Sequence, residues 1–304
     1  MRADVHQHLW TEPLIAALEC RERLPFVRRS GDICIIHAAG EPTSGVDLAG
    51  ERLGRRADLV DADGLDRAYV ALSSPLGIEA LPRSESQPLI DAYLDGVARL
   101  PAEFGAWGPV ALDGAEPADV DAVLACGCIG VSLPAGALGT PRAVAAIAPL
   151  LERLEQRDAP LFIHPGPGLH ERPGEISLSD PLWWPALTRY VAQMQAAWLA
   201  FVTLGRRDHP RLRILFAMLA GGAPLLSERL LARGGPRVDL RDPLTFYDTS
   251  SFGLAAIDAL KPLVGADQIL YGSDRPVVEP LAGAHQALAG ADAGRLLAAG
   301  ALAA

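Results

Sequence analysis

The sequence predicts an α/β protein of the (β/α)8 type, a distorted TIM-like barrel formed by a single domain. Short apolar runs typical of buried strands alternate with helical patterns along the chain, and eight such runs occur, as a closed barrel requires. The length of 304 residues suits one barrel, which typically takes about 250 residues plus insertions. No G-x-G-x-x-G sequence follows the first strand, which argues against an open dinucleotide-binding sheet.

Each predicted strand is a short run rich in β-branched or aromatic residues between turn-forming residues. The third is the least regular because glycines interrupt it. Since the runs are apolar and helical segments separate them, we expect a parallel sheet covered by helices. The predicted strands span residues 3–8, 67–73, 104–112, 128–133, 160–164, 212–218, 245–250 and 268–273.

The segments between the strands repeat apolar residues at the spacing of one helix face. In the most regular of them, Thr140 is predicted to cap the amino end and Pro141 to occupy the first helical position. The predicted helices span residues 89–100, 118–125, 141–156, 185–205, 224–233 and 257–265.

An insertion rich in Gly, Asp and Arg follows the first strand at about residues 30–62. We expect it to be a long loop over the carboxyl-terminal face of the barrel, where it would form part of a lid over a substrate. No internal repeat or low-complexity linker interrupts the sequence, so residues 1–304 are predicted to form one domain.

The chain is acidic, with a formal net charge of −10. This charge argues against a nucleic acid or an anionic membrane as partner, since both require basic patches, and a small-molecule substrate is the expected ligand. No apolar run is long enough to span a bilayer and the amino terminus lacks the apolar segment of a signal peptide, so we expect a cytoplasmic protein. The tryptophan-rich helical segment at 183–198 makes a homodimer a further expectation.

Lysine and cysteine are scarce, and this limits the chemistry. Lys261 is the only lysine and its helix looks exposed, so we expect neither a Schiff base nor a carboxylated lysine in a site. The four cysteines form no disulfide framework. Cys126 and Cys128 have the wrong spacing for a zinc knuckle and are expected to be buried, reduced thiols.

Ligand-type residues lie at the ends of three predicted strands. His6 and His8 are two positions apart on the first strand, so their imidazoles project to the same side. His164 ends the fifth strand, and Asp274 follows the eighth. Taken singly, each has a structural alternative: a satisfied interior histidine, or an aspartate that caps the next helix. Because the carboxyl ends of barrel strands face one cleft, the four together predict a site for one divalent transition metal ion.

Three motifs carry a resemblance to a known family. The His-x-His of the first strand, His164-Pro-Gly after the fifth and Gly-Ser-Asp274-x-Pro after the eighth resemble those of the amidohydrolase superfamily. The most similar branch is amidohydrolase-2, which contains aminocarboxymuconate-semialdehyde decarboxylase and related lactone hydrolases. Further similar segments lie at 71–77, 209–214 and 264–274, so the resemblance spans nearly the whole chain.

The resemblance implies one catalytic metal ion, zinc in first place and manganese in second. It would be held by His6, His8, His164 and Asp274, and Asp274 would also be the catalytic residue that moves a proton. Binuclear members of the superfamily use a carboxylated lysine on the fourth strand. Residues 128–133 contain no lysine, which agrees with a single metal ion.

The sequence departs from the family where the sixth strand ends. Family members carry a histidine there, before a glycine pair, and it orients or deprotonates the attacking water. Met218 occupies that position, and a thioether fills space but cannot act as a base. Either Asp274 serves alone as the general base, or another group takes over, or catalysis is lost.

Four residues near the predicted site are candidates for binding a substrate. His37 lies in the insertion and His170 in a Gly/Pro-rich loop after the fifth strand, and each has the alternative of a surface or core histidine. Arg275 follows Asp274 directly, where its guanidinium would hold a substrate carboxylate or form a structural ion pair. Trp10 would line a pocket or belong to the core.

The predicted function is hydrolysis of a small carboxylated, lactone or amide substrate by metal-activated water. The metal would stabilise the oxyanion, and Asp274 would move the proton. A metal-dependent, non-oxidative decarboxylase is the alternative within the same branch. A catalytically impaired barrel that acts as a binding protein is the third; Met218 favours it, and the retention of all four presumed ligands argues against it.

Overall fold

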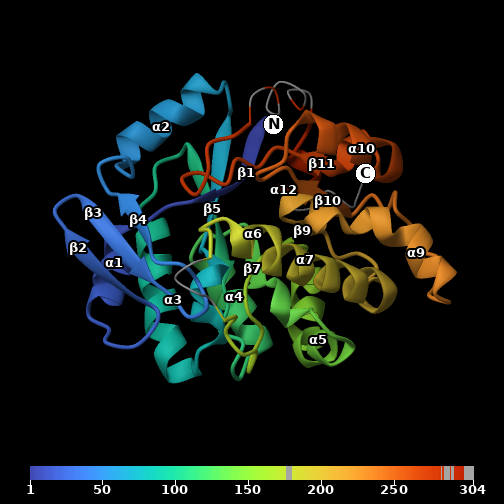
Figure 1. The fold of residues 1–304 in the computed structure, drawn as a ribbon, viewed down its shortest axis with the longest axis horizontal. Coiled ribbons are helices and arrows are strands. Elements are labelled where there is room, and N and C mark those ends of the chain that lie inside the picture. Colours follow the sequence, from blue (N-terminus) through green and yellow to red (C-terminus); the bar gives the residue numbers. More distant parts are fainter. Residues whose placement is uncertain (176–179, 282, 284–287, 289–290, 298–304) are drawn as a thin grey trace.

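The computed structural model describes residues 1–304 with the exception of 176–179, 282, 284–287, 289–290 and 298–304. Eight parallel strands form a nearly closed barrel in which their order follows the chain (Figure 1). All eight predicted strands are confirmed, although most of them are shorter than predicted. They are β1 Ala3–His8, β5 Arg67–Ala71, β6 Phe104–Pro109, β7 Gly130–Pro134, β8 Leu161–His164, β9 Ile214–Phe216, β10 Thr245–Asp248 and β11 Ile269–Leu270.

The barrel closes between β11 and β1 through separate backbone hydrogen bonds and not through a regular ladder. Asp274 N donates to the His6 carbonyl at 2.9 Å, and His8 N donates to the Arg275 carbonyl at 2.7 Å. This seam accounts for the predicted distortion of the barrel. It also places the end of β1 directly beside the segment that follows β11.

Aromatic side chains fill the interior of the barrel. Trp107 and Phe162 are fully buried, with ring centroids 5.3 Å apart, and the Trp107 indole donates to the Val5 carbonyl at 3.0 Å. Phe162 also contacts the ring of His6, with centroids 4.9 Å apart. The interior is therefore a packed core, and His6 rests on it.

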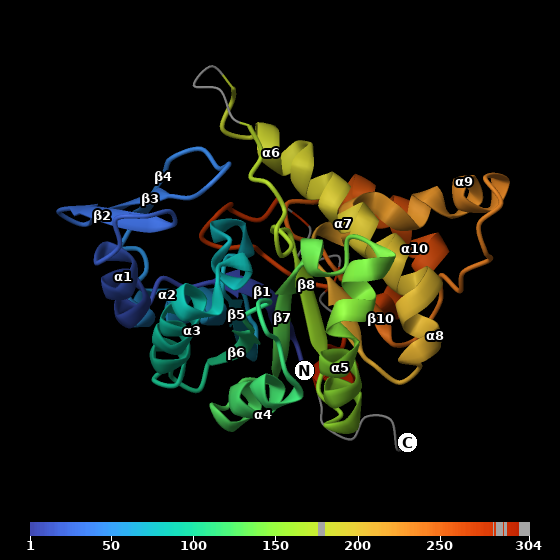
Figure 2. The ribbon, with the colours of Figure 1, turned by 90° about the horizontal axis from the view of Figure 1, so that it is seen from below.

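Helices cover the outer face of the barrel (Figure 2). The predicted N-cap is confirmed: Thr140 Oγ1 accepts a hydrogen bond from Ala143 N at 3.1 Å. No helix in the described part of the chain is both long and apolar enough to cross a membrane. The helices are α1 Glu12–Glu19, α2 Leu53–Ala62, α3 Arg83–Val97, α4 Pro117–Ala125, α5 Pro141–Gln156, α6 Trp184–Leu187, α7 Arg189–Ala200, α8 Arg206–Asp208, α9 Ser227–Ala232, α10 Leu254–Val264 and α12 Gly294–Leu297.

Two helical predictions need the largest adjustment. The helix predicted at 89–100 begins earlier, at Arg83, whose backbone N–H donates to the Asp113 carboxylate at 3.0 Å. The helix predicted at 185–205 is divided into α6 and α7 at Thr188 and ends in a π turn at Phe201–Gly205. A periodic apolar pattern predicts the buried face of a helix but not such interruptions of the backbone.

The prediction of a loop at 30–62 is wrong. The segment belongs to a small antiparallel sheet of β2 Phe26–Ser30, β3 Ile33–His37 and β4 Ser44–Asp47, which α2 follows. The first hairpin turns at Gly31, whose φ of 63° suits glycine. Exposed arginines and serine on β2 break the apolar pattern by which strands are identified. In Figures 1 and 2 the small sheet lies beside α1, at the edge of the barrel.

The scarce cysteines form neither a disulfide nor part of a metal-ligand group in the described part of the chain. All four cysteines are free thiols, and Cys128 is buried as predicted. Cys126 is exposed, contrary to the prediction, because it ends α4 as its C-cap before Gly127 turns the chain toward β7. Lys261 lies on α10, where its amine is 3.9 Å from the Asp258 carboxylate.

Candidate metal centre

The structure brings the four predicted metal ligands together at the carboxyl-terminal mouth of the barrel. His6, His8, His164 and Asp274 each offer one ligand atom, and these atoms all lie within 4.8 Å of one another. His8 Nε2 is 3.2 Å from His6 Nε2 and 3.2 Å from Asp274 Oδ1. The three histidines are buried, whereas the Asp274 side chain is 13% exposed. We call these four residues the donor cluster.

Three strand ends produce this convergence. His6 and His8 occupy β1, and His164 is the last residue of β8. Asp274 follows β11 and has a φ of 63°, a left-handed conformation that aspartate tolerates better than most residues. The backbone therefore turns sharply at Asp274, which directs its carboxylate back toward the histidines.

The outer nitrogens of the histidines are engaged by hydrogen-bond acceptors. Nδ1 of His8 lies 2.9 Å from the Ala71 carbonyl, and Nδ1 of His164 lies 2.9 Å from the Pro165 carbonyl. A carbonyl oxygen only accepts, so each of these Nδ1 atoms carries the proton and donates it. The Nε2 lone pair of each ring then points into the donor cluster, as ligation of a cation requires.

The three imidazole rings stand at nearly right angles to one another. Each pair of ring centroids is 4.9 Å apart, and the interplanar angles are 87°, 88° and 89°. The in-plane nitrogen lone pairs of three rings and a carboxylate repel one another at this spacing, and a divalent cation between them would remove the repulsion. The residues present therefore fit one transition metal ion.

His164 is held in the neutral form that binds a metal. Burial lowers its pKa well below the usual value, and the neighbouring His6 and His8 lower it further. The hydrogen bond to the Pro165 carbonyl acts in the opposite direction and does not offset these effects. An unprotonated imidazole is the ligating form, so the surroundings prepare His164 for this role.

Asp248, the last residue of β10, orients His6 from behind. Its Oδ2 lies 2.8 Å from His6 Nδ1, and its Oδ1 accepts from Met218 N at 2.9 Å and from Ser250 N at 2.9 Å. Burial acts to raise the pKa of Asp248, but attraction to His6 and hydrogen bonds from His6 and Ser250 outweigh it, so the pKa falls below its usual value. The ionised carboxylate fixes the Nδ1–H tautomer of His6.

No motif in the sequence indicated Asp248, although one signal was present. It lies near the end of the seventh predicted strand, and an acidic residue near the end of a barrel strand is the feature by which Asp274 was recognised. Asp248 is entirely buried, which only the packing of β10 against its neighbours reveals.

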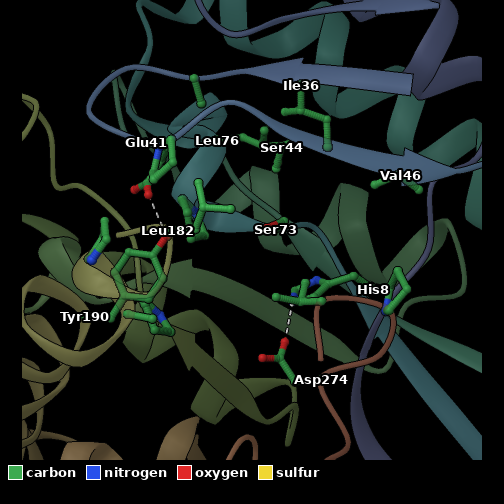
Figure 3. Close-up of a pocket in the computed structure, with 18 of the residues that line it drawn as sticks. His8, Ile36, Glu41, Ser44, Val46, Ser73, Leu76, Leu182, Tyr190 and Asp274 are labelled. Atoms are coloured by element: carbon green, nitrogen blue, oxygen red, sulfur yellow. Dashed lines mark hydrogen bonds and ion pairs between the residues drawn. The ribbon is translucent and has the colours of Figure 1, made fainter. Parts of the chain in front are cut away.

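A cavity of about 310 Å³ opens above the donor cluster (Figure 3). The small antiparallel sheet forms one wall, and the segment around α6 and the start of α7 forms another. Glu41 and Tyr190 lie across the cavity from His8 and Asp274. The lining is largely apolar and includes Trp10, Ile36, Val46, Pro75, Leu76, Pro165, Leu182, Pro185, Ala186, Met218, Pro276 and Val277.

The wall formed by the small sheet is tied to α7. The Tyr190 hydroxyl donates to Glu41 Oε2 at 2.8 Å, and Arg189 forms an ion pair with the same carboxylate. Arg189 also donates to the Gly40 carbonyl at 2.7 Å. The insertion therefore forms one wall of the cavity, as a sheet and not as a loop, and its role as part of a lid stays a prediction.

Trp10 is the one predicted substrate-binding residue that lines the cavity among the described residues. His37 does not line the cavity. Ile36 faces the cavity, and successive side chains on a strand point to opposite sides. The His37 ring therefore points away and stacks on the Phe26 ring, with centroids 4.6 Å apart. His170 is exposed on a turn with a φ of 63°.

Arg275 also lies outside the cavity lining, so the prediction that it holds a substrate carboxylate is corrected. Its guanidinium forms an ion pair with Asp63, at the end of α2, and another with Glu279 at 3.1 Å. The structural ion pair was the alternative reading of this residue. Asp63 is remote in sequence, so only the folded chain could decide between the two.

Met218 lines the cavity, at the position where the sequence resemblance implied a histidine. Its φ of 55° begins a left-handed stretch that continues through Gly222 and turns the chain away from β9. The backbone N–H of Met218 thereby reaches Asp248, while the thioether faces the cavity. The end of β9 supports the donor cluster but supplies no acid or base.

Comparison with known proteins adds a family and a fold. A family model described as Amidohydrolase matches residues 3–301. No curated protein matches the sequence. Among solved structures, IDCase from Metarhizium anisopliae in apo form is 18% identical with a TM-score of 0.72, and the match covers 100% of this chain and 96% of that chain.

Two further solved structures have the same fold. The 5-carboxyvanillate decarboxylase from Novosphingobium aromaticivorans, with bound manganese and 3-methoxy-4-hydroxy-5-nitrobenzoic acid, is 20% identical with a TM-score of 0.70, covering 96% of this chain and 91% of that chain. The 2,6-dihydroxybenzoate decarboxylase from Rhizobium is 16% identical with a TM-score of 0.61, covering 95% and 92%. At these identities the likeness establishes the fold alone.

Proposed function

Since the chain belongs to the amidohydrolase family, we propose that it is a metal-dependent, non-oxidative decarboxylase of a small carboxylated substrate. One observation carries the proposal: the donor cluster lies at the base of a largely apolar cavity, and among the described lining residues no separate acid or base lies on the same side as His8 and Asp274 (Figure 3). Two of the solved structures with this fold are decarboxylases by name, which supports the same reaction.

The ionisable side chains of the cavity argue for decarboxylation over hydrolysis. Among the described lining residues, Glu41 and Tyr190 are the ionisable side chains that lie outside the donor cluster. Glu41 is held by Arg189 and Tyr190, and burial raises the pKa of Tyr190 far above its usual value. Both side chains lie across the cavity from His8 and Asp274 (Figure 3), so neither is placed beside the donor cluster to take a proton from water there. Hydrolysis, the function predicted first from the sequence, therefore has less support than a reaction that delivers a proton to carbon.

We propose one divalent metal ion as the cofactor, manganese or zinc, held by the donor cluster. When bound, it supplies positive charge for the carboxylate or an adjacent hydroxyl of the substrate. Three imidazoles and one carboxylate suit either metal. The manganese in the Novosphingobium decarboxylase supports manganese, whereas the sequence resemblance placed zinc first.

Asp274 is the proposed proton carrier, because it belongs to the donor cluster and also lines the cavity. In the proposed reaction the bond between the substrate carbon and its carboxylate carbon breaks. The electron pair stays on the substrate carbon and forms the new C–H bond with a proton that Asp274 takes up from solvent and passes on, and CO2 leaves. The apolar walls, among them Trp10 and Leu76, favour this step because a charged carboxylate becomes a neutral product.

Detection of CO2 tests the proposal. Protein loaded with Mn²⁺ or Zn²⁺ is incubated with a panel of hydroxylated benzoates and aryl lactones. We expect one CO2 for each carboxylate consumed, loss of release on chelation, and its return when metal is restored. Opening of a lactone without CO2 would replace the proposed reaction with hydrolysis. A protein that binds carboxylates but converts none would indicate the third function, a binding protein.

Met218→His tests whether the missing base decides between the two reactions. The left-handed backbone at Met218 suits histidine better than most residues, so the fold should tolerate the change. The new imidazole would face the cavity as a base for water, and we expect lactone hydrolysis to rise by about 10²-fold. CO2 release should change little. Met218→Leu, which keeps an apolar side chain, is the control; equal hydrolysis by both variants would show that this position does not limit attack by water.

A further inference from the structure

Arg56, on α2, is a buried arginine outside the cavity lining. Only 2% of it is exposed, and Glu51 neutralises it: Nη1 donates to the two carboxylate oxygens at 3.0 and 2.8 Å. A charged group is kept in the interior only where its partners offset the loss of hydration. The remaining contacts of the guanidinium show what it holds in place.

Arg56 binds the backbone that carries two members of the donor cluster. Nη1 donates to the His8 carbonyl at 3.0 Å, and Nη2 approaches the Arg275 carbonyl at 3.4 Å. Arg275 directly follows Asp274. These two segments are the ones between which the barrel closes without a regular ladder. Arg56 therefore bridges the seam next to both ligands, and it joins the same two segments as the bond from His8 N to the Arg275 carbonyl.

A second branch of contacts reaches His6. Nη2 of Arg56 donates to Gln7 Oε1 at 2.6 Å, and Gln7 Nε2 donates to Asp4 Oδ2 at 2.7 Å. Asp4 Oδ1 accepts from His6 N at 3.1 Å and from Ser273 N at 3.0 Å. The pairing of β1 with β5 is irregular between Asp4 and Gln7. Side-chain bonds thus stabilise the stretch of β1 where the backbone ladder does not.

We propose that Arg56 is a positioning residue, which sets the separation of His8 and Asp274 so that one cation can bind both. The proposal rests on the proposed metal centre and not on the reaction. The shape of the side chain matters as well as its charge. A planar guanidinium directs N–H groups to Glu51, Gln7 and two carbonyls at once, and a lysine ammonium cannot reproduce that fork.

The test measures the affinity of the full-length Arg56→Lys variant for Co²⁺, whose visible absorption reports coordination geometry. Arg213→Lys is the matched control. Arg213 is also buried, with 1% exposed, and donates to the Leu296 carbonyl at 2.7 Å, but it precedes β9 at the opposite end of the barrel. We expect Arg56→Lys to lower Co²⁺ affinity by about tenfold or more and to alter the spectrum. Arg213→Lys should lower the Tm of the metal-free protein and leave affinity and spectrum unchanged.

Glu51→Gln keeps the arginine but removes its counter-charge, and it is the second test variant if Arg56→Lys does not fold. A smaller loss of Co²⁺ affinity with an altered spectrum is expected for it. If Arg56→Lys kept the Co²⁺ affinity and spectrum of the unmodified protein and only lost Tm, as Arg213→Lys does, Arg56 would be a structural residue and the proposal would be overturned. Unmodified protein that binds no Co²⁺ would overturn the metal centre itself, a failure that is visible before any variant is compared.

Discussion

Asp274→Asn is expected to lower the rate of CO2 release by about 10²- to 10⁴-fold, the range for removal of a positioned proton donor. The Asp274 side chain is 13% exposed and lines the cavity, and its Oδ1 lies 3.2 Å from His8 Nε2. It can therefore contact both a cation and a substrate. Asparagine keeps one oxygen ligand but cannot carry the proton, so the rate should fall further than the metal content does.

The measurement compares turnover at equal metal occupancy, determined by elemental analysis of each sample. Glu279→Gln is the control, because this carboxylate is also near the end of the barrel but its side chain is 79% exposed and it pairs with Arg275. We expect Glu279→Gln to behave as the unmodified protein. An Asp274→Asn variant that retains full metal and most of the activity would show that Asp274 is a ligand without a role in proton transfer.

Asp248→Asn is expected to weaken metal binding by about 10- to 100-fold, as loss of an outer partner of a ligating histidine does. Oδ2 of Asp248 accepts from His6 Nδ1, and Oδ1 accepts from Met218 N and Ser250 N. Every one of these contacts requires an acceptor. Whichever way an asparagine is turned, its NH2 group faces a donor, either the imidazole or the backbone N–H groups.

Facing the imidazole, the NH2 group would move the His6 proton to Nε2 and remove that nitrogen as a ligand. The test is titration of the metal-free variant with Mn²⁺ or Zn²⁺ against a chelator of known affinity. Ser250→Ala provides the graded control: it removes the hydroxyl that lies 2.6 Å from Asp248 Oδ1 and keeps the carboxylate, so its loss of affinity should be smaller. Equal affinity in Asp248→Asn and the unmodified protein would mean that His6 is oriented by its neighbours without this carboxylate.

The barrel and the donor cluster were predictable because both depend on regular backbone geometry. Apolar runs such as Leu161–His164 must be buried, and eight of them with helices between them leave few ways to cover the sheet. Once strands are parallel, their carboxyl ends share one face. Residues at the ends of β1 and β8 and after β11 then meet without any further information. The period of two along β1 also fixes that His6 and His8 point the same way.

The tertiary structure alone decided what surrounds the donor cluster. Arg275 is directed away from the cavity because Asp63, distant in sequence, binds its guanidinium. Asp248 and Arg56 become supporting residues only because the fold brings the end of β10 and one side of α2 within hydrogen-bonding distance of β1. Such pairings are set by the free energy of burying one charged or polar group against another, which depends on contacts between remote segments. A local pattern of apolar residues specifies burial, but it does not specify the partner.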